Sequence, residues 1–352
     1  MKLLDCAQYR EEVSGLANSS LDWERLNGQT ILITGATGMI ASCLVDALMM
    51  RNQTAGMDCR ILAVGRSEDK ARDRFGQWFG TPWFSFLNWD INQPEDRPME
   101  HVDYVLHAAS NTHPVAYATD PIGTVTANVI GLHNMLELAS AARAKRVVFL
   151  SSVEIYGENR GDTDCFREDY CGYIDCNTLR AGYPESKRTG EALCQAYIKQ
   201  KNLDIVIPRL ARVYGPTLLK TDTKALSQFL KNAVANEDII LKSQGMQYYS
   251  YLHVYDAISG IMTCLLKGKC GEAYNVSDPS CDVRLRDLAT LIANAAGRKV
   301  VFQIPDAIES AGFSKATMAR MNSAKLQSLG WKAALSLPEG INRTINILRE
   351  AY

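Results

Sequence analysis

The chain of 352 residues carries 38 lysines and arginines against 39 aspartates and glutamates, which leaves a net charge of −1. Such a balance excludes the basic surface that nucleic-acid binding requires. No apolar run approaches the roughly 20 residues that span a bilayer, and the amino terminus has charges that a secretory signal lacks. Length and composition therefore predict a soluble cytoplasmic enzyme with no nucleic-acid or membrane partner.

The ten cysteines give no sign of a metal centre. Cys43, Cys194 and Cys264 lie in helix-like apolar patterns, where a thiol packs as a small hydrophobic group. Three more share the segment 165–176 without Cys-x-x-Cys spacing or a neighbouring histidine. The sequence therefore predicts no metal site.

In chain order, residues 1–27 come first and have the pattern of a helical extension, to which the sequence assigns no chemistry. After them, short apolar runs typical of strands alternate with segments of helical periodicity. The expected strands are Thr30–Ile33, Arg60–Val64, Phe84–Leu87, Tyr104–His107, Val147–Leu150 and Ile205–Pro208, and the expected helices cover 40–50, 68–79, 122–142 and 184–201. This alternation predicts an α/β fold, a Rossmann-type doubly wound parallel sheet with helices on both faces.

The first expected strand runs directly into a glycine turn, Thr34-Gly-Ala-Thr-Gly-Met-Ile-Ala41, and helical periodicity follows. Such a turn cradles a pyrophosphate, because glycines permit close approach of the backbone and the helix start supplies free N–H groups. The spacing is Gly-x-x-Gly-x-x-Ala, whereas Gly-x-Gly-x-x-Gly is commoner. The turn predicts a dinucleotide site that includes Gly35, Thr37, Gly38, Met39 and Ile40.

The regularity loosens after Gly215-Pro216. Helical patterns at 223–236, 255–267, 284–296 and 336–350 alternate there with shorter runs such as Glu237–Leu241 and Val300–Ile304. This part predicts a smaller C-terminal α/β substrate lobe. We expect the dinucleotide-binding domain at 28–208 and the substrate-binding lobe mainly at 209–352, with segments of about 245–276 returning to the first domain.

Tyr183 and Lys187 lie one helical turn apart in the run Gly182-Tyr-Pro-Glu-Ser-Lys187, so both side chains belong to one helix face. An ammonium beside a phenol stabilises the phenolate, and we expect it to lower the tyrosine pKa from about 10 towards neutrality. The pair would then act as a base for an alcohol proton while a dinucleotide accepts the hydride.

These features resemble the extended short-chain dehydrogenase/reductases, and more narrowly their nucleotide-sugar epimerases, dehydratases and decarboxylases. The resemblance rests on the glycine turn, Asp90 after the third strand, His107-Ala-Ala-Ser110 after the fourth, Ser151-Ser152 after the fifth, and the Tyr183…Lys187 pair. Downstream, Arg209-Leu-Ala-Arg-Val-Tyr-Gly-Pro216, Gly245-Met-Gln, Val254-Tyr-Asp256 and Lys325-Leu-Gln-Ser-Leu-Gly-Trp331 are similar to landmarks of that family's substrate lobe.

The resemblance implies roles for the central residues. Tyr183 would deprotonate a sugar hydroxyl at C4, Lys187 would bind the nicotinamide ribose, and Ser152 would hydrogen-bond the reacting oxygen. Further cofactor contacts are implied for Asp90, Ile91, Ala108, Ala109, Ser110 and Asn128. NAD or NADP should stay tightly bound, because the hydride is expected to return to the same sugar. The helix at 122–142 and the one that starts at Tyr183 resemble the pair through which this family forms homodimers.

The end of the second strand bears on the choice between NAD and NADP. NAD-specific sites have an Asp or Glu there for the ribose 2′-hydroxyl, but this strand ends Val64-Gly-Arg-Ser67. Arg66 is suited to pair with a 2′-phosphate, which favours NADP. A solvated loop arginine is the alternative, and it would leave the choice open.

The reaction that follows the oxidation depends on Val153 and Glu154, next to Ser152. The similar 4,6-dehydratases have an Asp-Glu pair here, and the aspartate protonates the leaving C6 hydroxyl. Val153 has no proton to donate, although GDP-mannose dehydratases manage with a serine. Plain 4-epimerases usually have a small or uncharged residue where this chain has Glu154. UDP-glucuronate decarboxylases keep the glutamate and need no acid, since oxidation at C4 makes a β-keto acid that loses carbon dioxide.

Arg180, three residues before Tyr183, matches an arginine of the decarboxylases and the GDP-mannose dehydratases, and it is able to pair with a carboxylate or a diphosphate. We therefore expect decarboxylation of a nucleotide-uronic acid. A 4-epimerase, a 4,6-dehydratase and an NADP-dependent sugar-nucleotide reductase remain open alternatives. A non-catalytic reader of dinucleotide redox state is a competing class, but such proteins commonly lose the tyrosine or the lysine.

Four positions depart from the decarboxylase pattern, and one of them is Val153, where a serine is usual. Tyr249 replaces an arginine that usually holds the substrate diphosphate, Arg212 replaces an asparagine, and Lys224 replaces an arginine. The displaced positive charge indicates a different nucleotide or sugar. The other expected substrate residues are Thr112, His113, Ser152, Val153, Glu154 and Arg180.

Overall fold

The computed structural model describes residues 3–94, 101–112, 114–303 and 317–351. Its main sheet has eight strands in the order β11-β7-β5-β4-β1-β2-β3, with β6 paired to β7, and the neighbouring strands run parallel. These strands are β1 (Thr30–Thr34), β2 (Arg60–Gly65), β3 (Phe84–Asn88), β4 (Tyr104–His107), β5 (Arg146–Phe149), β6 (Ser151–Ser152), β7 (Ile205–Leu210) and β11 (Ala273–Val276). The parallel sheet expected from the sequence is confirmed.

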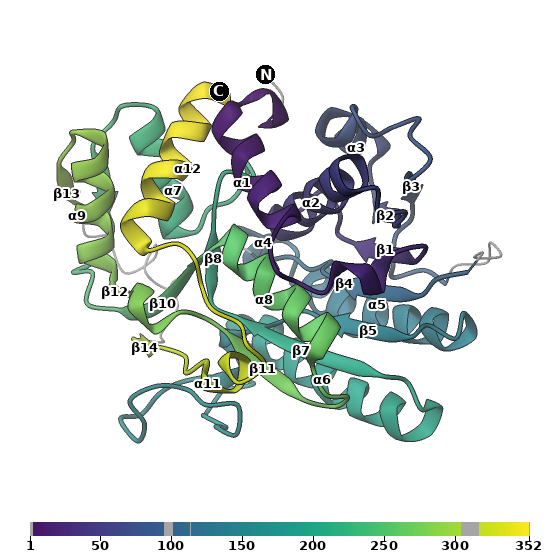
Figure 1. Ribbon diagram of the computed structural model, residues 1–352. Coiled ribbons are helices and arrows are strands. Elements are labelled where there is room, and N and C mark those ends of the chain that lie inside the picture. The colour runs from purple at the N-terminus through teal and green to yellow at the C-terminus, as the bar shows by residue number, and fades with distance from the viewer. Residues whose placement is uncertain (1–2, 95–100, 113, 304–316, 352) are drawn as a thin grey trace.

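Helices cover both faces of this sheet (Figure 1). One face carries α2 (Met39–Ala55), α3 (Glu68–Phe75) and α8 (Val254–Lys267), and the other carries α5 (Pro121–Ala141) and α6 (Gly182–Lys201). Side chains alternate between two separate cores, because Ile31 and Ile33 of β1 pack in one and Leu32 in the other. Burial on both faces explains why the strands are continuous apolar runs.

The C-terminal part builds a second, smaller lobe beside the main sheet (Figure 1). A four-stranded sheet contains β8 (Arg212–Tyr214), β10 (Tyr248–His253), β12 (Asp282–Arg284) and β14 (Met318–Ala319), and β9 (Ile239–Leu241) pairs with β13 (Val300–Phe302). Its helices are α7 (Ala225–Val234), α9 (Leu285–Ala296), α11 (Ala324–Gln327) and α12 (Leu337–Ala351). The chain between these pieces returns to the main sheet as α8 and β11.

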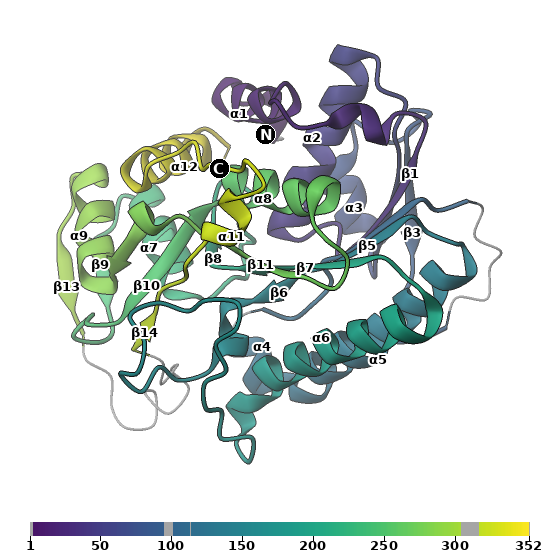
Figure 2. The same cartoon turned by 60° about the horizontal axis from the view of Figure 1, so that its bottom comes forward.

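The amino-terminal segment packs against both lobes. It contains η1 (Leu3–Asp5), α1 (Ala7–Ala17) and η2 (Trp23–Leu26), and α1 contacts α2, α8 and α12 (Figure 2). The Tyr9 hydroxyl donates to the buried Asp46 carboxylate at 2.7 Å, and the Arg74 guanidinium donates to the same carboxylate. No helix in the described part of the chain is long and apolar enough to cross a membrane.

Candidate active site

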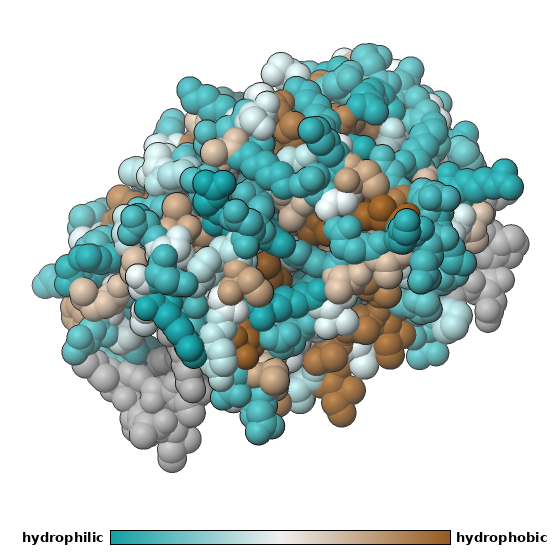
Figure 3. All heavy atoms as spheres, turned by 90° about the horizontal axis from the view of Figure 1, so that it is seen from below, coloured by the Kyte–Doolittle hydropathy of each residue, from teal (hydrophilic) through white to brown (hydrophobic). Residues whose placement is uncertain are grey.

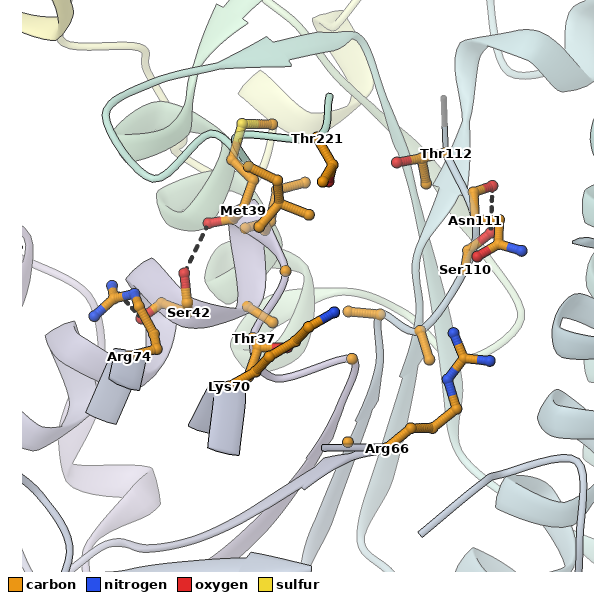
Figure 4. Close-up of a pocket in the computed structure, with 18 of the residues that line it drawn as sticks. Thr37, Met39, Ser42, Arg66, Lys70, Arg74, Ser110, Asn111, Thr112 and Thr221 are labelled. Carbon is orange, nitrogen blue, oxygen red and sulfur yellow. Dashed lines mark hydrogen bonds between the residues drawn. The ribbon is translucent and has the colours of Figure 1, made fainter. Parts of the chain in front are cut away.

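A cavity of about 590 Å³ opens where the glycine turn, the end of β2 and the loop after β4 meet. Figure 4 shows this space, with Met39 and Thr221 on one side and Ser110 and Thr112 on the other. The segment 217–224 closes the cavity from the second lobe: the Thr217 hydroxyl donates to the Met39 carbonyl at 2.8 Å. The cavity therefore lies at the carboxyl edge of the parallel strands, where α/β folds bind their ligands.

The glycine turn is shaped for a ligand with a pyrophosphate. Gly35 has a φ of +63°, and a Cβ there would lie 2.7 Å from the Ala109 Cα, so only glycine permits this close approach. Gly38 caps α2 without a side chain, which leaves the helix N-terminus open to an anion. Thr34 Oγ1 accepts the N–H groups of Ala108 and Ala109 at 3.2 Å and fixes the opposite wall. These residues fit a dinucleotide.

The expected cofactor residues mostly converge on this cavity. Its lining includes Gly35, Thr37, Gly38, Met39, Ile40, Arg66, Asp90, Ile91, Ala108, Ala109 and Ser110. Tyr183 and Lys187, also expected at the cofactor, do not line the cavity. Asn128 does not line it either and is buried on α5. Its amide donates to the Ser186 hydroxyl at 2.9 Å, and that hydroxyl donates to the Tyr183 carbonyl at 2.8 Å. Asn128 therefore fixes the start of the catalytic helix.

The wall near Arg66 carries a second cation that sequence reasoning missed. Lys70 lies in the first turn of α3, whose N-cap is Ser67, and its side chain lines the same cavity as Arg66. Figure 4 shows both side chains reaching into this space. The sequence did contain a signal for Lys70. It follows Arg66 by four residues at the start of the helix expected at 68–79, so both side chains belong to the same end of that helix.

Ser152, Tyr183 and Lys187 come together beside the cavity. Ser152 ends β6, and its hydroxyl lies close enough to the Tyr183 phenol to favour a lower pKa of that group. Lys187 is 2% exposed and donates to the Leu150 carbonyl at 2.8 Å, with its Nζ 6.0 Å from the centre of the Tyr183 ring. The structure therefore brings the three expected catalytic side chains together.

The expected lowering of the Tyr183 pKa is wrong for this structure. Burial, followed by the nearby Glu154 carboxylate, holds the pKa of Tyr183 well above its ordinary value, against the Ser152 hydrogen bond and Arg180. Burial also acts on Lys187, and there it lowers the pKa, to about 7. The reason is that the start of α6 lies inside the protein, which a helical-face pattern does not reveal, and desolvation opposes both charges. The phenol therefore keeps its proton in the structure as it stands.

Glu154 and Arg180 form an ion pair next to the catalytic tyrosine. Arg180, in η4 (Leu179–Ala181), donates from Nη2 to both carboxylate oxygens of Glu154, in η3 (Val153–Tyr156), at 2.8 Å. Val153 is buried and offers no proton. The pair places a carboxylate and a guanidinium at the edge of the site, 26 residues apart in the chain.

The remaining expected substrate residues fall into two groups. Lys224 donates from Nζ to the Thr112 carbonyl at 3.2 Å, and both residues line the cavity. Arg212 and Tyr249 lie instead on neighbouring strands of the second sheet, with the Arg212 guanidinium 3.5 Å from the centre of the Tyr249 ring. Arg212 Nη1 is buried and has no hydrogen-bond partner in the described part of the chain. His113 lies outside the described residues.

A Rossmann sheet whose glycine turn opens into a cavity beside Ser152, Tyr183 and Lys187 defines a dinucleotide-dependent enzyme of the short-chain dehydrogenase/reductase class. The sequence model of the NAD dependent epimerase/dehydratase family matches residues 31–277. The chain therefore belongs to this family, which confirms the resemblance seen in the sequence.

Individual relatives agree with the family assignment. UDP-glucuronic acid decarboxylase 1 of Danio rerio is 29% identical over 316 residues, covering 90% of this chain and 71% of the relative. UDP-glucuronic acid decarboxylase 6 of Arabidopsis thaliana is 29% identical over 315 residues, covering 88% and 86%.

Solved structures share the fold. The dTDP-glucose 4,6-dehydratase DesIV of Streptomyces venezuelae, with NAD bound, superposes with a TM-score of 0.76 at 22% identity, covering 92% of this chain and 97% of the other. The UDP-glucuronic acid 4-epimerase of Bacillus cereus, in complex with UDP-glucuronic acid and NAD, gives 0.74 at 20% identity, covering 92% and 100%.

Proposed function

We propose that this enzyme oxidises a nucleotide sugar at C4 with a bound dinucleotide and then decarboxylates it, so that the substrate is a nucleotide-uronic acid. The observation that carries the proposal is the Glu154–Arg180 ion pair beside Tyr183, with an apolar Val153 where a dehydratase needs an acid. The decarboxylases among the relatives support it.

The first half of the reaction uses Tyr183, Ser152 and Lys187. Tyr183 takes the C4 hydroxyl proton, while the Ser152 hydroxyl bonds the oxygen as it becomes a ketone. When bound, an oxidised nicotinamide supplies a hydride acceptor. Lys187 lies on the same helix as the base, and its Nζ donates a hydrogen bond to the Leu150 carbonyl.

The second half needs little from the protein. A carboxylate at C5 of a 4-keto sugar is a β-keto acid, so the C5–carboxylate bond breaks and its electron pair moves into the C4 carbonyl. The resulting enolate oxygen accepts hydrogen bonds from Ser152 and Tyr183. A proton then returns to C5, hydride returns to C4, and a nucleotide pentose leaves. Arg180 is the cation best placed to orient the substrate carboxylate.

We propose NADP as the preferred dinucleotide. NAD is the cofactor in solved members of the fold, but β2 ends without a carboxylate for the ribose 2′-hydroxyl. Arg66 and Lys70 bring two positive charges to that wall of the cavity, and a 2′-phosphate matches them in charge.

We also propose a homodimer. Ile122, Val125 and Ile130 are exposed along α5, and the first of them is 77% exposed. Leu179 is exposed in the nearby η4. Figure 3, which views the molecule from below, shows apolar side chains gathered on this face. Monomeric proteins seldom leave such a group of large apolar side chains in water, and a second copy would bury it.

Mass spectrometry of products tests the function. The enzyme is incubated with UDP-, GDP-, CDP- and dTDP-linked sugars, including uronic acids. Loss of one carbon dioxide from a uronic acid supports the proposal. Loss of water indicates a dehydratase, an isomer of unchanged mass indicates an epimerase, and consumption of added NADPH indicates a reductase.

A further inference from the structure

The catalytic tyrosine carries a second aromatic ring on its face. Tyr117, in the short helix α4 (Pro114–Thr119), is 7% exposed, and its ring lies parallel to that of Tyr183 within 29°, with the ring centres 5.0 Å apart. This geometry is a stacked aromatic pair. Nothing in the sequence marks Tyr117, because the contact joins residues that are far apart in the chain.

Arg180, which pairs with Glu154, also contacts the ring of Tyr117. The Arg180 guanidinium lies 4.8 Å from the centre of the Tyr117 ring, a cation–π contact, while its Nη2 donates to both Glu154 carboxylate oxygens. The contacts therefore form one continuous series from Glu154 through Arg180 and Tyr117 to Tyr183. Each link is a directional interaction between buried or half-buried groups.

The polar groups nearest to Tyr183, which are Glu154, Ser152 and Arg180, act on its phenol group. The Ser152 hydroxyl acts on the phenol oxygen, and a contact at the oxygen does not by itself set the plane of the ring. Lys187 stands 6.0 Å from the ring centre and makes its hydrogen bond elsewhere, with the Leu150 carbonyl. A stacked neighbour restricts the ring plane and also covers the ring face against water.

We propose that Tyr117 is a positioning residue, which fixes the plane of the Tyr183 ring and keeps water from it, and which the Glu154–Arg180 ion pair holds in place. The proposal rests on the role of Tyr183 as the base in the proposed function. It gives Glu154 and Arg180 an effect on the first half-reaction, before any carbon–carbon bond breaks.

Chemical acetylation of tyrosines tests the stacking without substrate or cofactor. Wild type, Tyr117→Phe and Tyr117→Leu are treated with N-acetylimidazole, and modification of Tyr183 is followed by peptide mass spectrometry. Tyr173, which is exposed, serves as the internal reference. Tyr183 should react about five- to tenfold faster in Tyr117→Leu, since loss of one stacked ring makes local opening more frequent. Tyr117→Phe keeps the stack and should match the wild type.

Kinetics provide the second readout. Tyr117→Leu should lower kcat about 10- to 100-fold and change KM less than about threefold, whereas Tyr117→Phe should stay within about threefold of the wild type in both. Loss of activity in Tyr117→Phe equal to that in Tyr117→Leu would show that the hydroxyl acts and would overturn the proposal. Equal Tyr183 acetylation in all three proteins would also overturn it.

The two readouts separate this inference from the proposed function. If no nucleotide sugar is converted, the proposed function is wrong. The acetylation rates then still show whether Tyr117 protects the Tyr183 ring. If turnover occurs and Tyr117→Leu retains it, the function stands and the positioning role fails. If thermal unfolding shows that Tyr117→Leu does not fold, Tyr117→Met is used in its place, because its side chain is unbranched. The expected results are the same.

Discussion

At the scale of single residues, the chemistry depends on a phenol whose surroundings resist its ionisation. Burial raises the pKa of Tyr183 and lowers that of Lys187, so neither group carries a charge easily where it lies. If Tyr183 is the base, as proposed, we expect the bound substrate and cofactor to stabilise its phenolate.

Tyr183→Phe removes the proton acceptor and little else, because the ring and its stack with Tyr117 remain. We expect turnover to fall by about 10²- to 10⁴-fold, the usual contribution of a general base. Dinucleotide affinity, measured by calorimetry, should stay within about threefold, since the phenol is not part of the pyrophosphate site. Tyr173→Phe, at an exposed tyrosine, is the control. Full activity in Tyr183→Phe would assign the base to another residue.

Arg66→Ala and Lys70→Ala test the cofactor preference. Each should weaken NADP binding about tenfold and leave NAD binding nearly unchanged, because only NADP has the 2′-phosphate that a guanidinium or ammonium attracts. Arg72→Ala is the matched control, since Arg72 lies on the same helix but pairs with Glu68 at its surface. The measurement is calorimetric titration with both dinucleotides. An unchanged ratio of the two affinities in both variants would exclude the 2′-phosphate site.

At the scale of secondary structure, the elements that build the site were largely predictable. Strands such as Tyr104–His107 are continuous apolar runs because two cores bury them, and the glycine turn marks the first strand–helix junction. Tertiary contacts were not predictable. Lys70, Tyr117 and the burial of α6 depend on which elements meet in space, and the predicted direction of the Tyr183 pKa was wrong for that reason.

The amino-terminal helix α1 offers a test of how this extension is anchored. Burial, opposed by Arg343 across 3.9 Å, raises the pKa of Glu12 on α1 to about 7. The folded state therefore holds this proton more tightly than the unfolded chain, so the stabilisation is present below pH 4.5 and is lost as the pH rises through about 7.

Glu12→Gln should remove this loss. Relative to the wild type, the variant should gain about 2 kcal/mol in free energy of unfolding between pH 5 and pH 8, because its amide does not ionise. Urea unfolding at the two pH values measures this difference. Glu11→Gln, at the exposed neighbouring position, is the control. If the free energy of unfolding changes with pH in the same way in the wild type and in Glu12→Gln, folding does not raise the pKa of Glu12.

At the scale of the whole molecule, two lobes share one site. The first lobe contains the glycine turn and α6, and the segment 217–224 of the second lobe lines the other side of the cavity. Thr217 and Lys224 tie this segment to the first lobe through the carbonyls of Met39 and Thr112. We expect release of a bound dinucleotide to require these contacts to open.

The exposed apolar face of α5 predicts the oligomeric state. Ile122→Glu combined with Ile130→Glu should convert the proposed dimer to a monomer, because two carboxylates would be buried without partners at the interface. Light scattering after size exclusion measures the mass. Phe302→Glu changes a 58% exposed side chain on β13, on the other lobe, and should leave the dimer intact. A wild-type monomer at all concentrations would contradict the prediction.

The central claim is that Tyr183 starts an oxidation at C4 whose hydride returns to the same sugar. The most direct measurement uses the nucleotide-uronic acid that the product screen identifies, with deuterium at C4, and follows the product by mass spectrometry, with Tyr183→Phe for comparison. We expect a nucleotide pentose that has lost carbon dioxide and kept its deuterium at C4, formed at least about 100-fold more slowly by Tyr183→Phe. A decarboxylated product with hydrogen at C4, or one that Tyr183→Phe makes as fast as the wild type, would contradict the account.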